Sequence, residues 1–458
     1  MGIRTGFWPL LKLAAPIGFA QAGVALMGLV DTAVLGRAGA VPLAAAGLAN
    51  AIFITGIVFG MGVLMGLDGL IAQSVGAGRA TRGRELLWQG IWLSAGLGAA
   101  LTLPILLGSL LLERGGIEAE VAEQARRYLA WRWPSIFPHL AFIAARSYLQ
   151  AVKRIRDLVL ATVVANLANL GGDVLLVFGG ADLPAWTGPL RSLPALGVAG
   201  AALTTTACAF LQLAITCGGV SAIRTPERPR RRFVWRDARA VARIGVPVGA
   251  HQLAEVGVFA LAGFLAGRMG ATSMGAHQIA ITIASFTFCL ALGIGNAGSV
   301  LVGWAVGARD TAEARRAGLR AFGVAALLMG GNAVLLGTLS RQIASLMTDQ
   351  AEVLEMTACL LVVAGAFQLS DGIQAVGAGV LRGAGDSRFT FAANVVGHYL
   401  VGLPIALWLG PWGGGGVRGI WWGLSAGLTA VAAALSWRFW RLSSREIVPL
   451  DGKAAEPP

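Results

Sequence analysis

Long apolar windows recur from one end of this 458-residue chain to the other, and they constrain its fold more than any motif does. Each window holds roughly 20 residues, which in a helix is enough to cross about 30 Å of hydrocarbon. Hydrophobic residues make up 56% of the chain and charged residues 13%. Because a backbone in lipid must satisfy its hydrogen bonds internally, these windows predict an all-α polytopic membrane protein.

The windows predict twelve transmembrane helices. We expect them at residues 10–36, 43–68, 88–112, 128–151, 157–179, 197–222, 240–267, 272–300, 317–340, 354–380, 388–410 and 416–440. Most of the 36 Lys and Arg fall in segments on the side of the N-terminus, so the positive-inside rule places both termini in the cytoplasm of a cell inner membrane. The net charge of +13 thus reflects topology and contact with membrane lipid, and no nucleic acid is expected as a partner.

The sequence repeats itself with an offset of 231 residues, over which residues 16–77 match 247–308. Residues that set helix bends and contacts coincide along this match: Pro16 with Pro247, Gly18 with Gly249, Gly36 with Gly267, and Gly62 with Gly293. A repeat of six helices keeps its orientation in the membrane, so we expect two pseudo-symmetric six-helix bundles. The predicted parts are an N-lobe at 1–222, a basic cytoplasmic linker at 223–239, a C-lobe at 240–440 and a cytoplasmic tail at 441–458.

Polar residues inside the first lobe form one candidate site. Charges at membrane depth are rare and usually functional, and Asp31 lies within the first apolar helix. Asn166, Asn169 and Asp173 stand at i, i+3 and i+7 on the fifth helix, which places them on one face. Their oxygens suit a hard cation such as Na⁺, and they suit a structural hydrogen-bond network equally well.

The second lobe carries two further polar stripes, on the helices predicted at 240–267 and 354–380. Their members follow three- and four-residue spacings: His251, Gln252 and Glu255 on the first, and Gln368, Asp371 and Gln374 on the second. No Lys or Arg lies within a turn of Glu255 or Asp371, which favours a functional role over interhelical hydrogen bonding alone. Asp68, near the predicted cytoplasmic boundary, fits a structural or gating role better than ion binding.

Several classes of activity are excluded by what the sequence lacks. There is no phosphate-binding G-x-x-x-x-G-K-[ST] motif for primary pumping, and no ring of residues typical of a channel filter. The four histidines are scattered without an HExxH pair, so neither an enzyme, a metal site nor a cofactor is expected. What remains is ion-coupled transport. Burial favours a protonated carboxylate, whereas the ionised group attracts Na⁺ or a cationic substrate, and competition between these occupants produces exchange.

Several stretches together resemble the MATE (multidrug and toxic compound extrusion) family. They are LVDTAVLGRAGAVPLAAAGLANA, AQSVGAG, NLANLGGD and AHQIAITIASFTF, with HQLAEVGVF and LSDGIQAVGAGVLRGAGDSRF similar to its NorM-type branch. The resemblance implies a V-shaped fold and export of amphipathic organic cations by alternating access, in exchange for H⁺ or Na⁺. By position, Asp31 resembles the family's first-helix carboxylate, Asn169 and Asp173 its fifth-helix pair, and Glu255 and Asp371 its C-lobe acids.

One departure and several open alternatives accompany this resemblance. Two glycines precede Asp173, where bulkier residues are common in the family. Na⁺ could bind at Asp31, Asn169 and Asp173 or at Glu255 and Asp371, with H⁺ as the other coupling ion. The related flippases of lipid-linked oligosaccharides are the alternative function, and a monomer is expected.

Overall fold

The computed structural model describes residues 6–110, 112, 116–181 and 184–450, and within these ranges the chain is helical without a β-strand. The first lobe comprises α1 (Phe7–Ala38), α2 (Ala40–Gly76), α3 (Ala80–Leu110), α4 (Ala119–Arg132), η2 (Trp133–Ser135), α5 (Ile136–Ala151), α6 (Ile155–Phe178) and α7 (Val198–Ser221), with η3 (Ala185–Ser192) between the last two. The second comprises α8 (Trp235–Arg268), α9 (Ala271–Gly307), α10 (Thr311–Thr338), α11 (Ser340–Ser345), α12 (Ala351–Ala384), α13 (Ser387–Val395), η4 (Val396–Gly402), α14 (Leu403–Leu407), η5 (Trp408–Trp412) and α15 (Gly416–Ser443).

Eleven helical spans in the described ranges are long and apolar enough to cross a membrane. The twelfth crossing is formed by α4, η2 and α5, which together replace the single helix predicted at 128–151. Pro134 lies in η2, where a proline cannot donate a backbone hydrogen bond and so breaks the regular helix. The crossing also begins earlier, at Ala119, because its first turns carry charged residues that hydropathy does not count as membrane-spanning. The predicted twelve-helix, two-bundle fold is confirmed.

Several helices extend beyond their predicted ends. α2 continues to Gly76 instead of ending at 68, and α8 begins at Trp235, inside the segment predicted as linker. The added turns are more polar than the hydrocarbon-spanning windows, so apolar length alone underestimates them. Of the predicted tail at 441–458, residues 451–458 lie outside the described residues.

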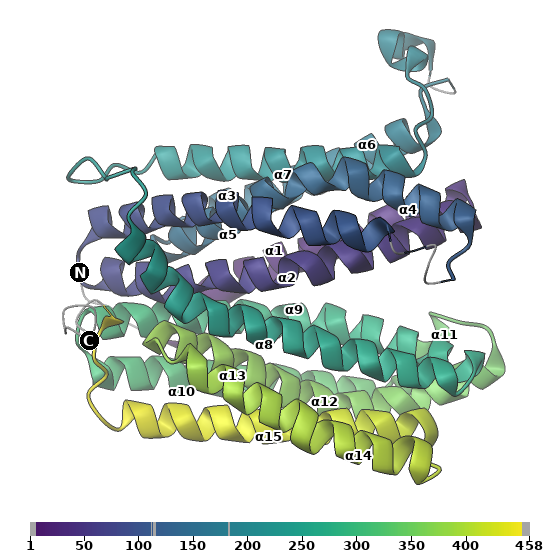
Figure 1. The fold of residues 1–458 in the computed structure, drawn as a ribbon. Coiled ribbons are helices and arrows are strands. Elements are labelled where there is room, and N and C mark those ends of the chain that lie inside the picture. The colour runs from purple at the N-terminus through teal and green to yellow at the C-terminus, as the bar shows by residue number, and fades with distance from the viewer. Residues whose placement is uncertain (1–5, 111, 113–115, 182–183, 451–458) are drawn as a thin grey trace.

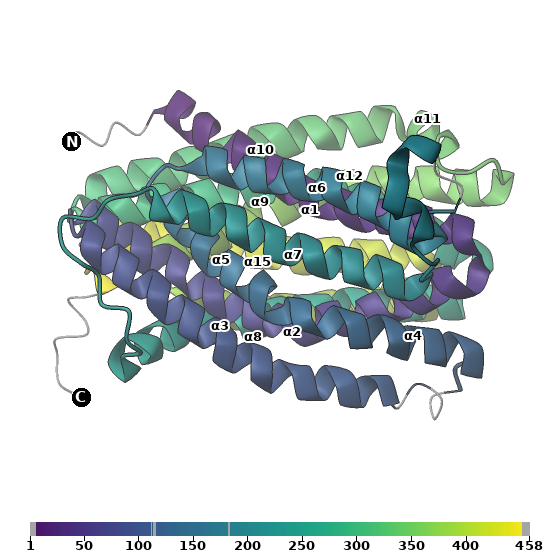
Figure 2. The same ribbon diagram turned by 90° about the horizontal axis from the view of Figure 1, so that it is seen from above.

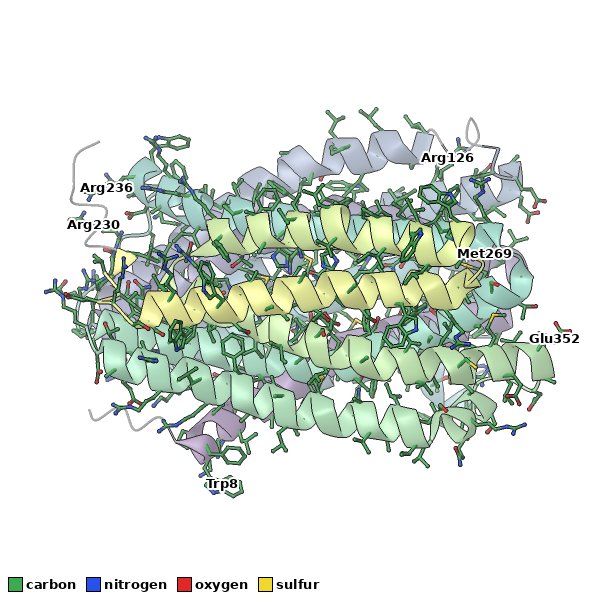
Figure 3. The ribbon with its side chains drawn as sticks, turned by 90° about the horizontal axis from the view of Figure 1, so that it is seen from below. Trp8, Arg126, Arg230, Arg236, Met269 and Glu352 are labelled. Atoms are coloured by element: carbon green, nitrogen blue, oxygen red, sulfur yellow. The ribbon has the colours of Figure 1, made fainter. Side chains whose placement is uncertain are left out.

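The two lobes lie side by side, with α1–α7 above and α8–α15 below in Figure 1. The described chain starts and finishes at the same end of the bundle, which we call the terminal end; the opposite end is the distal end (Figures 1 and 2). Arg230 and Arg236 lie at the terminal end, and Met269 and Glu352 at the distal end (Figure 3). The linker between the lobes therefore runs along the terminal end.

The sequence repeat is reproduced in the backbone. α2 spans Ala40–Gly76 and α9 spans Ala271–Gly307, so both boundaries of the second helix recur at the offset of 231. The glycine before each helix, Gly39 or Gly270, has φ of 135° or 105°, which is the region that favours glycine. One backbone plan has therefore been used twice.

The lobes touch through glycines in the terminal half. A Cβ at Gly62 of α2 would collide with the backbone of Gly249 on α8, and a Cβ at Gly293 of α9 would collide with that of Gly18 on α1. The offset of 231 that relates Gly62 to Gly293 also relates Gly18 to Gly249, so the two contacts are copies of each other. Toward the distal end, a Cβ at Gly28 of α1 would meet no other described part of the chain within 4 Å. Close backbone approach thus joins the lobes near the terminal end.

Candidate functional site

Asp31 joins three helices of the first lobe. Its Oδ1 accepts a hydrogen bond from Nδ2 of Asn169 on α6 at 2.9 Å. Its Oδ2 accepts one from Oγ1 of Thr205 on α7 at 3.1 Å. Asn169 is fully buried and Asp31 is half-buried on α1. The structure therefore brings Asp31 into direct contact with the fifth membrane helix, α6.

Asp173 lies one turn further along α6 and is fully buried. Within the described part of the chain, neither of its carboxylate oxygens accepts a hydrogen bond of standard geometry, although Thr204 and Asn169 lie close enough to interact with it, and Oδ1 of Asn169 also has no donor. The Asp173 and Asp31 side chains are close enough to interact electrostatically. Burying a carboxylate without donors is costly, so this group of oxygens favours a proton or a cation.

The two glycines before Asp173 differ in their surroundings. A Cβ at Gly172 would come within 2.6 Å of Cγ2 of Thr204 on α7, so a glycine is needed for α6 and α7 to pack this closely. A Cβ at Gly171 would meet no described atom outside its own helix within 4 Å. The helix remains regular through both residues, and the departure from the family pattern has a packing reason at Gly172.

Asn166 shares the face of Asn169 but does not reach Asp31. Its Nδ2 donates to the backbone oxygen of Thr162 at 2.9 Å, within α6. Its Oδ1 is buried without a donor in the residues described. A Cβ at Gly23 of α1 would come within 3.3 Å of Asn166 Nδ2, so this amide lies at the α1–α6 contact.

Glu255 is the centre of a second polar group, in the other lobe. Its Oε1 accepts a hydrogen bond from Nε2 of Gln374 on α12 at 2.8 Å. Its Oε2 lies 3.2 Å from Nε2 of His251, one turn earlier on α8. That imidazole nitrogen is also 3.5 Å from Nδ2 of Asn394 on α13. Both oxygens of Glu255 thus face nitrogen atoms.

Asp371 and His398 complete the group around Glu255. Asp371 on α12 is buried, interacts electrostatically with Glu255, and its Oδ1 has no donor among the described residues. His398 is fully buried, and neither ring nitrogen has a hydrogen-bond partner in the part of the chain that is described. It lies on the π-helical segment η4, a geometry that often marks functional sites.

The three glutamines of the second lobe's polar stripes have different neighbours. Gln374 contacts Glu255, as above. Gln252 Nε2 lies 3.4 Å from Sδ of Met65 on α2, across the lobe boundary. Gln368 Nε2 donates to the backbone oxygen of Ala284 and to Oγ1 of Thr287, both on α9. Gln368 therefore joins helices of the second lobe, and among the described residues it forms no hydrogen bond with an acid.

Asp68 forms an ion pair between the lobes. It is buried, and its Oδ2 lies 3.2 Å from Nε of Arg382 on α12. Ser147 on α5 donates to Asp68 Oδ1, and Nη2 of Arg382 donates to Oδ1 of Asn296 on α9 at 3.0 Å. The pair lies in the terminal half, where the glycine contacts also join the lobes. α2 continues for two turns beyond Asp68, so this residue is deeper in the helix than predicted.

The MatE family model matches residues 16–175 and again residues 247–408. The starts of the two matches are 231 residues apart, so the family's unit corresponds to the repeat of this chain. The chain belongs to the MATE family of membrane transporters.

Relatives and solved structures of MATE proteins cover nearly all of the chain. It is 34% identical to the probable multidrug resistance protein NorM of Bradyrhizobium diazoefficiens, over 96% of this chain and 94% of that protein. It is 31% identical to the multidrug resistance protein NorM of Burkholderia vietnamiensis, over 93% and 92%. The fold matches a MATE transporter in an outward-facing conformation with a TM-score of 0.85, at 20% identity over 96% of this chain and 97% of the other. The chain is therefore a multi-pass protein of the bacterial plasma membrane.

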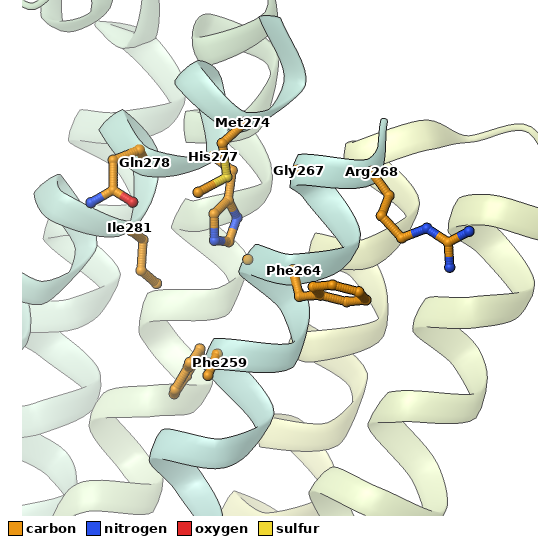
Figure 4. A pocket seen from close by; sticks show the side chains of 10 residues that line it. Phe259, Phe264, Gly267, Arg268, Met274, His277, Gln278 and Ile281 are labelled. Atoms are coloured by element: carbon orange, nitrogen blue, oxygen red, sulfur yellow. The ribbon is translucent and has the colours of Figure 1, made fainter. Parts of the chain in front are cut away.

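A groove of about 570 Å³ lies between the distal halves of α8 and α9 in this MATE fold (Figure 4). Phe259, Gly263 and Phe264 line it from α8, and Met274 and His277 from α9. It begins one helical turn from Glu255, because Phe259 follows Glu255 by four residues.

Sequence reasoning missed several members of these groups. Thr205, Asn394, His398 and the partnership of Asp68 with Arg382 were not predicted. The run Thr204–Thr206 in an apolar helix is a local signal that could have identified Thr205. Asn394 and His398 are polar residues four apart in the helix predicted at 388–410, so they carry a similar local signal. The pairing of Asp68 with Arg382 has none, because the two residues lie on distant segments.

Proposed function

We propose that this chain is a secondary active multidrug antiporter that exports amphipathic organic cations in exchange for H⁺ or Na⁺. The curated relatives are named as multidrug resistance proteins, which supports the substrate class. The observation that carries the coupling is that each lobe holds a buried carboxylate oxygen with no donor among the described residues, in Asp173 and in Asp371. Such oxygens favour a proton or cation at membrane depth.

The lobe contacts support an outward-open state. With both termini in the cytoplasm, the terminal half that holds Gly62, Gly249 and the Asp68–Arg382 pair faces inward and is closed. An ion entering from the distal side would occupy the acids and weaken substrate binding. Reorientation of the lobes would then break the Asp68–Arg382 ion pair, so this pair acts as an inner gate. Once the site is open to the cytoplasm, cytoplasmic substrate would displace the ion.

A second candidate function is flipping of an anionic lipid-linked saccharide. Buried cations in the first lobe favour it. Arg146 Nη1 donates to Oε1 of Gln21 at 3.4 Å, and Arg132 lies over the ring of Phe53 at 4.6 Å from its centroid. A guanidinium at membrane depth would bind a phosphate.

Proteoliposomes containing the full chain separate these functions. Ethidium transport is measured with a pH gradient and a Na⁺ gradient imposed separately, with Asp371→Asn as the inactive control. We expect one gradient to drive ethidium transport in the wild type and not in the control. Scrambling of a fluorescent lipid-linked saccharide, with no ethidium transport under either gradient, would support the flippase and overturn the antiporter.

A further inference from the structure

At the terminal end, α2 and α9 meet in a contact that follows the repeat. A Cβ at Gly76 of α2 would collide with the backbone of Trp304 on α9, and a Cβ at Gly307 of α9 would collide with that of Gln73 on α2. The offset of 231 relates Gly76 to Gly307 and Gln73 to Trp304, so each collision is the copy of the other. Each helix thus brings a buried side chain, Gln73 or Trp304, to the junction of the lobes.

These two side chains form equivalent hydrogen bonds to the opposite lobe. Nε2 of Gln73 donates to the backbone oxygen of Gly383 in α12 at 2.9 Å. Nε1 of Trp304 donates to the backbone oxygen of Ala151 in α5 at 3.0 Å. Each acceptor lies two residues before a turn residue with positive φ, at positions 153 and 385. The acceptors are therefore equivalent as well, with an offset of 232.

The two copies differ in the partners that their side chains require. An indole has one N–H and no acceptor, so the bond to Ala151 satisfies Trp304. A glutamine amide also has an acceptor, and Oε1 of Gln73 accepts a hydrogen bond at 2.8 Å from the backbone N–H of Leu450. Because Gln73 is buried, loss of this donor would leave its oxygen unsatisfied.

Leu450 belongs to the segment that follows α15, residues 445–450, which we call the strap. In Figure 1 the strap runs along the terminal end from α15 toward the first lobe. The side chain of Ile447 is 4% exposed, and its N–H donates to Oγ1 of Thr311 on α10 at 3.2 Å. A Cβ at Gly385 would come within 2.6 Å of Cδ2 of Leu450, so this side chain lies directly over the turn after α12. The strap is therefore held on the second lobe, and its last residue binds the first.

We propose that the strap is a latch that holds the terminal side of the protein closed, with Gln73 as the residue of the first lobe that it binds. The proposal rests on alternating access in the proposed function, which requires the lobes to separate at this end. Separation breaks the hydrogen bond between Gln73 and Leu450, so the strap opposes inward opening. Without it, the Trp304 bond and the Asp68–Arg382 pair remain, and the equilibrium shifts toward the inward-open state.

A buried cysteine at the junction reports on inward opening. Ser299 is fully buried and precedes Gly303 by one turn of α9. A Cβ at Gly303 would be 2.6 Å from Cβ of Ala72 on α2, so Ser299 is on the face of α9 that meets the first lobe. Ser299→Cys is made with Cys217→Ala and Cys359→Ala, which remove the two exposed thiols. Its labelling by a membrane-impermeant maleimide is followed in inside-out vesicles, with the same chain lacking Ser299→Cys as the background.

Three variants of this full-length reporter test the latch. Deletion of residues 447–458 removes most of the strap, and Leu450→Pro removes the N–H that Gln73 accepts. Deletion of residues 451–458 is the matched control, because it leaves the strap in place. We expect the first two to raise the labelling rate at least about fivefold, as the loss of one net hydrogen bond predicts, and the control to stay within about twofold.

Two results would overturn the latch. One is an unchanged labelling rate in both Leu450→Pro and the deletion of 447–458; the other is an equal rise in the 451–458 control. The Tm in detergent shows whether each variant is folded, and Gln73→Leu, which removes the same hydrogen bond from the first lobe, decides the question if the longer deletion is not. If the wild type transports no ethidium under either gradient, the proposed function fails, and this result is distinct from both labelling outcomes.

Discussion

The two lobes of this MATE-family chain share a backbone but differ in the polar groups that they carry. Asp31 of the first lobe aligns with Ala262, and Glu255 of the second aligns with Val24. Their partners differ as well: Asp31 accepts from an amide and a hydroxyl, whereas Glu255 faces an amide and an imidazole. The repeat therefore determines how helices pack, and each lobe has its own chemistry.

This difference suggests a division of labour. In the first lobe, three buried oxygens of Asn169 and Asp173 lack donors among the described residues, an arrangement suited to an ion. In the second lobe, Oδ1 of Asp371 also lacks a donor among the described residues, but both oxygens of Glu255 face nitrogen atoms, and an aromatic groove begins one turn away. We accordingly expect ion coupling to depend more on the first lobe and substrate binding more on the second.

The largest effects are expected at the acids of the second lobe. Glu255→Gln and Asp371→Asn should reduce ethidium transport at least about tenfold, because each removes a carboxylate that attracts the substrate at membrane depth. Resistance of cells to ethidium and transport in proteoliposomes measure this, with expression level and Tm as controls for folding. Wild-type resistance in both well-expressed variants would contradict the assignment.

Asp31→Asn should show a different phenotype. Ethidium should still bind with a Kd within about twofold of wild type, but neither a pH gradient nor a Na⁺ gradient should drive its transport. Ion-driven efflux at the normal stoichiometry would break the proposed division between the lobes, as would loss of ethidium binding.

The ion pair between the lobes has no counterpart in the repeat, since Asp68 aligns with Ser299. Arg382→Gln removes the ion-pair partner of the buried Asp68 carboxylate, which keeps the hydrogen bond from Ser147, so the free energy of unfolding should fall by about 3–5 kcal/mol. Thermal unfolding in detergent measures the loss. The double variant Asp68→Asn/Arg382→Gln should recover most of it; a double variant as unstable as the single one would show that the pair is not the cause.

The two glycine contacts between the lobes, Gly62 with Gly249 and Gly293 with Gly18, should lose similar stability when a glycine is replaced. Gly62→Ala and Gly293→Ala each introduce a Cβ that meets backbone of the other lobe, and each should destabilise the protein by about 1–3 kcal/mol. Gly28→Ala, where a Cβ meets open space, should instead stabilise it by up to about 1 kcal/mol through helix propensity. Unequal losses of stability for Gly62→Ala and Gly293→Ala would show that the two contacts are alike in sequence but not in energy.

The smallest predicted effect is on ion affinity, and it distinguishes Asn169 from Asn166 on α6. Asn169→Ala removes the donor to Asp31 and should weaken binding of the coupling ion by about 1 kcal/mol, or roughly fivefold. Asn166→Ala removes a bond within its own helix and should leave ion affinity within about twofold. Ion-dependent quenching of tryptophan fluorescence measures both affinities. Equal losses would place Asn166 in the ion site after all.

The sequence by itself determined the membrane crossings, the repeat and the acids. Hydropathy reports on about 20 consecutive residues at a time, so it finds helices and misses their polar ends, as at Gly76 of α2. Spacing along one helix placed Asn169 and Asp173 on a common face, and it placed Asn166 there too, although Asn166 bonds within α6.

Tertiary structure alone decided which of these residues meet. The pairing of Gly62 with Gly249, of Asp68 with Arg382 and of Trp421 with His277 depends on helices that are far apart in the sequence. Periodicity gives the direction of a side chain around its own helix, whereas the partner that it faces depends on how the helices pack against each other. For that reason the acids could be predicted from the sequence, while the glycine contacts between the lobes, the Asp68–Arg382 ion pair and the aromatic groove could not.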